Sequence, residues 1–578
     1  MLELERLEEL FSSSVSWDRV WRDEATIDYQ YYNGAQWTQD EIDTLVDRGQ
    51  ATGVYNHIAP TIDAVIGGER QNRPDITMIG RTNDDERVAQ VKTSLYSYIE
   101  YNSDTDDEID LAVKDFLVVG RGWLYINPRL SGKEFDDIYH EYKDYRNMFS
   151  DPLNTRDDFK DARFVHEATF VDADVIEATF PTFKADEASD VVFGFEGSSE
   201  EHIWYDSQNR RRPRLITTWY RHANGDMELI IWVKGQILHQ VTNPYSTREF
   251  PYVQMTYKRN LDNQPYGVVR AMRSAQDEVN KRHSKALHYL NSRQVLAEED
   301  AFVDWNEAEK TLAKPDGITK LNDNALAEGR VQLVDNAQLA ATHIQMMEHA
   351  RSQITQLAGL NSAFMGQSSQ YESAKKTNLA LNQAQSTLVP MLNTIRKARH
   401  RLATITMQLV PDFYTDERII RIVNPTNEYA FMPVNQVVLA DDGTLVRMND
   451  VTSDDVDVII EDAPAGLNDR MEQFAQLLQI QGQTARPIPM EILLRYSSLK
   501  DKHQLAQELE QYYSMESQMQ QLQQYIQQLE SQMQQMGGQV NQVKSQLVQS
   551  ETARAVDKEV NKAKEDISKE KQRIKDSL

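Results

Sequence analysis

Apolar residues recur at helical spacing in the stretch PYGVVRAMRSAQDEVNKRHSKALHYLNSRQVL, which runs from Pro265 to Leu296. A turn signal that ends at Gly267 opens it, and no further Pro or Gly follows. The apolar positions close to a 3.6-residue period are Val268, Met272, Ala275, Val279, Ala286 and Leu290. This pattern predicts a long helix with a narrow apolar stripe, in a region that we delimit as residues 265–299.

A second pattern, of strict heptads, occupies the glutamine-rich tail. Apolar residues lie alternately four and three positions apart at Met515, Met519, Leu522, Ile526, Leu529, Met533, Met536, Val540, Val543 and Leu547. Such a seam predicts a helix that supercoils or bundles with copies of itself, although low-complexity disorder is the alternative. Its uncharged Gln flanks avoid repulsion between identical helices, while Gly537-Gly538 should weaken the helix locally. A second seam, from Val556 to Ile574, is shifted in phase, which predicts local unwinding or two separate helical sections.

The rest of the chain mixes both periodicities. Residues 83–119 resemble a helix pair, and residues 123–262 are mostly β, with a clear hairpin signal at Asn224-Gly225. A third long helix, from about Thr377 to Leu409, contains Pro390 and should be kinked there. Helices and strands segregated in this way indicate an α+β fold.

The helix predicted at residues 265–296 differs in charge from the rest of the chain. The chain carries 90 acidic and 62 basic residues, for a net charge of −28. This balance argues against a protein that grips nucleic acid over its whole surface, and it suits a soluble protein or a surface past which DNA slides. The helix of residues 265–296 is the exception, because only Asp277 and Glu278 oppose six cations. These cations are Arg270, Arg273, Lys281, Arg282, Lys285 and Arg293.

Motifs for catalysis or metal binding are missing from the sequence. It has no cysteine, no phosphate-binding G-x-x-x-x-G-K-[ST] loop and no H-E-x-x-H motif, so we expect no metal, no cofactor and no enzymatic activity. The aspartates near Asp104 lack the remaining positions of a calcium loop, and turn chemistry explains those near Asp151. No apolar run is long enough for a membrane span, and the acidic start MLELERLEEL does not predict a signal peptide.

The sequence holds two further basic clusters. One, at residues 210–214, precedes a predicted strand, and the other, at residues 396–401, follows the predicted kink. Each could contact phosphates, although a solvated face or salt bridges between subunits is the more ordinary interpretation. No aromatic residues are interleaved with them, which argues against base stacking.

In its order of elements the chain resembles the portal proteins of short-tailed double-stranded DNA phages. The resemblance rests on NHIAPTIDAVIGGERQNRPDI, on MFSDPLNTRDDFKDARFV and above all on the cationic helix, and it covers roughly residues 20–500. It implies an α+β portal fold with a mixed α/β wing, a two-helix stem, a small α/β clip, a helical crown and a C-terminal coiled-coil or barrel helix. The implied regions are 1–264 (wing), 265–299 (first stem helix), 300–335 (clip), 336–358 (second stem helix), 359–376 (channel-facing loop), 377–466 (kinked helix and wing strands), 467–510 (crown) and 511–578 (barrel).

The resemblance also implies a function. A ring of about twelve subunits would stand at one vertex of the virion capsid after assembly in the host cytoplasm. It would conduct double-stranded DNA during packaging and ejection, and it would dock terminase, a tail adaptor, and capsid and scaffolding proteins. The six cations of the first stem helix would touch the passing DNA backbone. A DNA-processing enzyme and a coiled-coil structural adaptor are the alternative functions.

Overall fold

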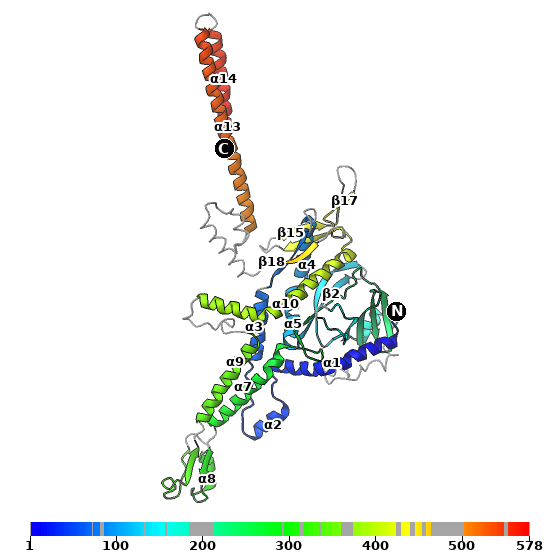
Figure 1. The fold of residues 1–578 in the computed structure, drawn as a ribbon, viewed down its shortest axis with the longest axis vertical. Helices are drawn as coiled ribbons and strands as arrows, with labels where there is room; N and C mark the ends of the chain where they lie inside the picture. The colour runs from blue at the N-terminus through cyan, green and yellow to red at the C-terminus, as the bar shows by residue number, and fades with distance from the viewer. Residues whose placement is uncertain are drawn as a thin grey trace. The chain divides into compact units, whose positions relative to one another are not determined.

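The computed structural model describes residues 2–576 except 72, 81–85, 132–133, 157–158, 184–211, 292–293, 313–316, 335–336, 360–373, 424–428, 440–444, 453–457, 464–501 and 548–552. The chain divides into two compact units, residues 1–465 and 466–578 (Figure 1). Each unit is considered by itself below.

The core of the first unit is built around a layer of helices. These helices are α1 (Leu4–Asn33), α3 (Ile58–Gln71), α4 (Glu86–Asn102) and α5 (Thr105–Val118), with the short α2 (Gln39–Asp47) in the connection after α1. Phe116 of α5 is fully buried, and Trp21 of α1 is buried as well and donates its indole N–H to the carbonyl of Val119 at 3.2 Å. The predicted helix pair at residues 83–119 is confirmed as α4 and α5.

Antiparallel sheets pack against these helices. A five-stranded sheet has the order β4-β5-β6-β7-β8, and a three-stranded sheet has the order β3-β2-β9. The strands are β2 (Arg121–Ser131), β3 (Glu134–Lys143), β4 (Met148–Ser150), β5 (Phe164–Phe170), β6 (Arg214–Arg221), β7 (Met227–Val233), β8 (Gln236–Thr242) and β9 (Tyr252–Thr256), and the short α6 (Ala173–Thr179) follows β5. The predicted hairpin at Asn224-Gly225 joins β6 to β7, with Gly225 at φ +88°. Described helices and antiparallel strands together make the unit an α+β fold.

A helical hairpin with a small domain at its tip follows the sheets. After the two-residue strands β10 (Lys258–Arg259) and β11 (Pro265–Tyr266), α7 runs over Val268–Asn291 and α9 returns over Ala337–Leu357 (Figure 1). Between them lie β12 (Gln294–Ala297), α8 (Trp305–Leu312) and β13 (Val331–Val334). The prediction that the helix continues to Leu296 was wrong, because residues 294–297 pair with β13 as an antiparallel strand.

The last part of the first unit combines a long helix with β-hairpins. Helix α10 (Ala374–Phe413) contains both Pro390 and Pro411, and its two halves run in different directions in Figure 1. The strands after it are β14 (Arg418–Val423), β15 (Tyr429–Val434), β16 (Gln436–Leu439), β17 (Leu445–Met448) and β18 (Val458–Ala463). Strand β18 pairs antiparallel with β1 (Asp75–Gly80), which returns the chain to its N-terminal part.

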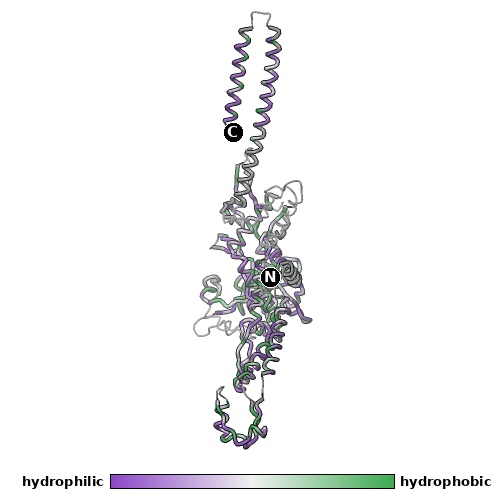
Figure 2. The backbone as a smooth tube through the Cα atoms, turned by 90° about the vertical axis from the view of Figure 1, so that its left-hand side faces the viewer, coloured by the Kyte–Doolittle hydropathy of each residue, from purple (hydrophilic) through white to green (hydrophobic). Residues whose placement is uncertain are grey.

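The described part of the second unit is a pair of helices. Helix α13 (Lys502–Leu547) carries the predicted seam, and α14 (Ala553–Asp576) runs back along it, as Figure 2 shows. The phase break between the seams thus marks two helical sections, one of the two outcomes predicted from the sequence. Helix α13 continues through Gly537-Gly538, and most of the region expected to form a crown, 467–510, lies outside the described residues.

Candidate functional site

The base of α7 is fixed by direct backbone packing against the end of α5. A Cβ atom on Gly267 would lie 2.2 Å from the carbonyl oxygen of Val118, and one on Gly120 would lie 2.3 Å from the carbonyl carbon of Tyr266. Gly120 also has φ +90°, which disfavours any residue with a Cβ. The two glycines therefore let β11 and the first turn of α7 lie against α5, which sets where the helix leaves the core.

Beyond its base, α7 buries the apolar stripe that the sequence predicts. The buried members are Val268, Met272, Ala275, Val279 and Ala286, whereas Leu290 is 59% exposed; Val269, outside the predicted stripe, is buried as well. Helix α9 is much less covered, since its buried residues are Ala340, Ala350 and Ile354 among those described. The two helices pack against each other, and α7 carries five of the six predicted cations.

The first two cations of α7 are bound to carboxylates of α1. The guanidinium of Arg273 donates to Oδ1 of Asp28 at 2.7 Å and to Oε2 of Glu24 at 2.7 Å, and Arg270 donates to the other oxygen of Asp28 at 3.2 Å. Asp28 is fully buried, and burial raises its pKa to about 6 although both arginines act to lower it. Sequence reasoning missed these partners, which lie some 240 positions away. The positive charges of Arg270 and Arg273 are therefore matched by carboxylates inside the chain.

Of the cations nearer the tip of α7, Lys281 and Lys285 are exposed, whereas Arg282 is half-buried like Arg270. Lys281 pairs with Glu41 at 3.4 Å, and Arg282 pairs with Glu278 and donates to Nδ1 of His343 at 3.3 Å. Burial lowers the pKa of His343, and the positive charges of the nearby Arg282 and Lys285 lower it further. Lys285 is exposed and has no ion pair with the part of the chain that the structure describes. Arg293 lies outside the described residues.

A row of buried polar side chains on α7 holds the loop that contains α2. Gln276 accepts from the backbone N–H of His57 at 3.0 Å and donates to the carbonyl of Tyr55 at 2.8 Å. Asn280 accepts from the N–H of Tyr55 at 3.1 Å and donates to the side chain of Gln36 at 2.7 Å. The sequence offered one faint signal for this contact, namely polar residues spaced four apart. The loop is thereby fastened along the side of α7.

Most of the seam residues of α13 are only partly covered. Leu522, Ile526, Leu529, Met533 and Val540 are half-buried, while Met519, Met536 and Val543 remain 43%, 46% and 45% exposed. The side chain of Leu547 lies outside the described set. Helix α14 provides the contact on this face within the same chain, and the proposed pairing with other copies remains a prediction.

The two other basic clusters have partners within the chain. Arg212 pairs with Asp172, and the guanidinium of Arg214 stacks on Phe149 and neighbouring aromatic rings. Arg399, on α10, is buried beside Glu100. Arg210 and Arg211 lie outside the described residues.

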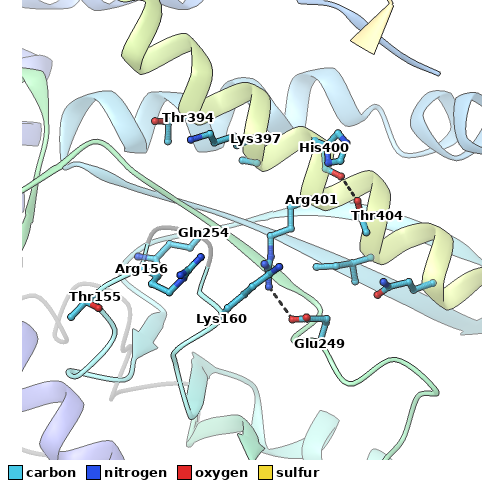
Figure 3. A pocket seen from close by; sticks show the side chains of 13 residues that line it. Thr155, Arg156, Lys160, Glu249, Gln254, Thr394, Lys397, His400, Arg401 and Thr404 are labelled. Carbon is cyan, nitrogen blue, oxygen red and sulfur yellow. Dashed lines mark hydrogen bonds and ion pairs between the residues drawn. The ribbon is translucent and has the colours of Figure 1, made fainter. Parts of the chain in front are cut away.

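Arg401 lines a cationic cavity of about 730 Å³ between α10 and the loop before β5 (Figure 3). Its guanidinium extends to Glu249 at 3.1 Å, and Arg156, Lys160 and Lys397 are the other cations of the lining. Contact of this surface with phosphates, or with another subunit, stays a prediction.

The aspartate clusters also have structural explanations. Asp106 and Asp110 pair with Arg73, at 2.6 Å each. Asp151 accepts the backbone N–H of Leu153 in its own turn, as the turn interpretation predicts, and also that of Arg163 just before β5. Among the described residues no group of three or more His, Cys, Asp or Glu side chains has the spacing of a metal site, and no helix there is long and apolar enough to span a membrane.

Comparison with known proteins places these features in a family. The portal protein of Helicobacter pylori bacteriophage KHP30 is 22% identical over 409 residues, which is 68% of this chain and 64% of that protein, so the chain spans slightly less than two thirds of this relative. Among solved structures, the neck of an empty gene transfer agent (GTA) particle with C6 symmetry is 10% identical with a TM-score of 0.35, covering 80% of this chain and 94% of the other. The neck of the native particle with C12 symmetry is also 10% identical, with a TM-score of 0.32 and coverage of 81% and 94%.

The model of the phage P22-like portal protein family matches residues 8–562 of the sequence, which is nearly its whole length. The chain therefore belongs to the P22-like portal protein family.

Proposed function

We propose that copies of this chain assemble into a ring that serves as the portal, or head-to-tail connector, of a phage capsid. The observation that carries the proposal is the family match over residues 8–562, together with a helical hairpin that bears a small α/β domain at its tip. A ring follows from a head-to-tail contact between identical subunits that closes on itself. We propose about twelve subunits, each in a structural and non-enzymatic role.

The regions of the fold have distinct parts in this proposal. Residues 1–264 and 377–466 form the wing, α7 and α9 form the stem, and the domain with β12, α8 and β13 forms the clip. The proposal also includes a channel-facing loop at 359–376 and a crown at 467–510, two ranges that lie mostly outside the described residues, and a helical barrel at 511–578. The pairing of β12 with β13 supports moving the start of the clip to about residue 294.

Passage of DNA through the ring requires weak and transient contact. A chain of net charge −28 repels phosphates over most of its surface, so a duplex slides without being held. We place the transient contacts at the exposed end of α7, with Lys285 as the main contact and Lys281 and Arg282 beside it. Arg270 and Arg273 instead fasten α7 to α1, which their ion pairs support. Arg293 remains in the proposed set on its sequence position alone.

The proposed partners follow from the position of a portal at one capsid vertex. The clip would receive the packaging terminase first and the tail adaptor later. The wing would meet capsid and scaffolding proteins, and double-stranded DNA would pass through the channel during packaging and ejection. Assembly would take place in the host cytoplasm.

A packaging experiment tests this function. Capsids assembled in cells with the chain should contain nuclease-protected genome-length DNA, and capsids assembled without it should contain none. Equal amounts of protected DNA in both would contradict the proposal. Of the alternatives, a DNA-processing enzyme would cleave DNA when the purified chain is given a divalent metal ion. A coiled-coil adaptor would leave DNA packaging unchanged when it is absent.

A further inference from the structure

Two ion pairs fix how α14 lies on α13. Lys544 pairs with Asp557 at 2.8 Å near the connection between the helices, and Lys571 pairs with Glu530 farther away. From the first pair to the second, the chain moves fourteen residues back along α13 and fourteen residues forward along α14. Fourteen residues are two heptads, so the helices run antiparallel in a constant register.

The same register brings the two apolar seams together. Met536, Val540 and Val543 of α13 face Val556 of α14 around a narrow cavity of about 240 Å³. When the register is continued along both helices, Ile526 lies opposite Ile574, the last apolar residue of α14. The seam that we predicted to join copies is thus met first by a segment of its own chain.

The hairpin leaves this seam incompletely covered. Met519 lies beyond the end of α14 in the register, and it is 43% exposed. Met536 and Val543, which α14 does face, remain 46% and 45% exposed. Two helices alone cannot enclose an apolar stripe from all sides, and exposed stripes of this length favour association. The hairpin therefore has room for another helix along α13.

Charge indicates which helix meets that partner. In α14, 14 of 24 residues are charged, whereas residues 515–547 of α13 contain only Glu516, Glu530 and Lys544 in 33 positions. Identical neutral helices can lie side by side without repulsion, while a densely charged helix is best left in water. A second copy of this chain is the partner that brings the same neutral, heptad-patterned surface.

We propose that each copy contributes an antiparallel two-helix hairpin to the tail, and that the exposed side of the α13 seam docks against α13 of a second copy. The tail is then a tube with α13 on its inner, shared side and α14 on its outer side. The hairpin stands on the contacts within one chain, whereas the docking rests on the self-association in the proposed function.

Engineered cysteine pairs test the hairpin directly, because the full-length chain has no cysteine of its own. Lys544→Cys with Asp557→Cys, and Glu530→Cys with Lys571→Cys, should each form a disulfide within one chain. On a denaturing gel without reductant, such a chain stays at the mass of a monomer and migrates faster than its reduced form. The matched control pairs Glu530→Cys with Asp557→Cys, which the register separates by about 21 Å along the axis, and it should not crosslink. Interchain dimers from the opposed pairs, or no disulfide at all, would overturn the hairpin.

A single cysteine tests the docking. Met519→Cys should join two chains through a short bifunctional thiol reagent, whereas Gln524→Cys, on the exposed opposite side of α13, should not. Equal crosslinking at both positions, or none at position 519 in an assembly that has the mass of a ring, would overturn the docking and leave the proposed function standing. A purified chain that stays monomeric would instead overturn the ring itself.

Discussion

Replacing Arg273 by Met separates the structural cations of α7 from the exposed ones. The change removes hydrogen bonds of 2.7 Å to Asp28 and to Glu24 and leaves the buried Asp28 carboxylate with Arg270 alone. Removing one partner of a buried ion pair costs about 3–5 kcal/mol, and we expect the lower end because Arg270 remains. This cost should appear as easier separation of α1 from α7.

Hydrogen exchange followed by mass spectrometry measures that separation locally. A loss of about 3 kcal/mol corresponds to roughly a hundredfold faster exchange in peptides that cover α1, if exchange there proceeds by local opening. The matched control is Lys285→Met, which removes an exposed cation and should change exchange by less than about threefold, or ~0.5 kcal/mol. Equal effects of the two substitutions, or no effect of Arg273→Met, would refute the division of α7 into fastened and exposed cations.

Three other predictions concern packaging, assembly and pH. Reversing the charges of Lys281, Arg282 and Lys285 together should lower the yield of packaged DNA more than it lowers the amount of folded ring. Normal packaging by that variant, measured as nuclease-protected DNA, would show that these cations are structural. A chain truncated at Ser514 lacks residues 515–578, which carry the apolar seams of α13 and α14, and should still form rings, so failure of all ring formation in native mass measurements would contradict an assembly interface outside that tail. Burial raises the pKa of Asp115 to about 7, so its contribution to stability is fully present below pH ~4 and is lost as the pH rises through about 7, by an amount on the order of 4 kcal/mol. Asp115→Asn should remove this loss of stability, measured by hydrogen exchange of α5 between pH 5 and 8. An unchanged pH profile would contradict the assignment of the loss to Asp115.

The sequence predicted those elements whose pattern is local. The heptads of α13, the apolar stripe of α7 and the Asn224-Gly225 hairpin are all periodic or turn signals within one short segment, and each corresponds to an element of the structure. Strand β3 was not singled out, because EFDDIYHEYK places charged residues on both faces. In the structure Asp137 and His140 of that strand are buried with hydrogen-bond partners from other elements.

The candidate site was harder to predict because its partners are distant in sequence. Six cations on one helix indicated a shared role, but Arg270 and Arg273 find carboxylates on α1, and no spacing rule connects positions 28 and 273. The end of the helix that begins at residue 268 was misplaced for a similar reason, since residues 294–297 become a strand only by pairing with residues 331–334. The antiparallel register of α13 and α14 likewise depends on pairs that only the folded hairpin defines.

The central claim, a closed ring with a channel, is tested most directly by the mass of the purified full-length assembly together with class averages viewed along its axis. The account predicts a discrete mass near twelve chains of 66.7 kDa and a ring with an open centre. A monomer, or an open filament without a channel, would contradict it.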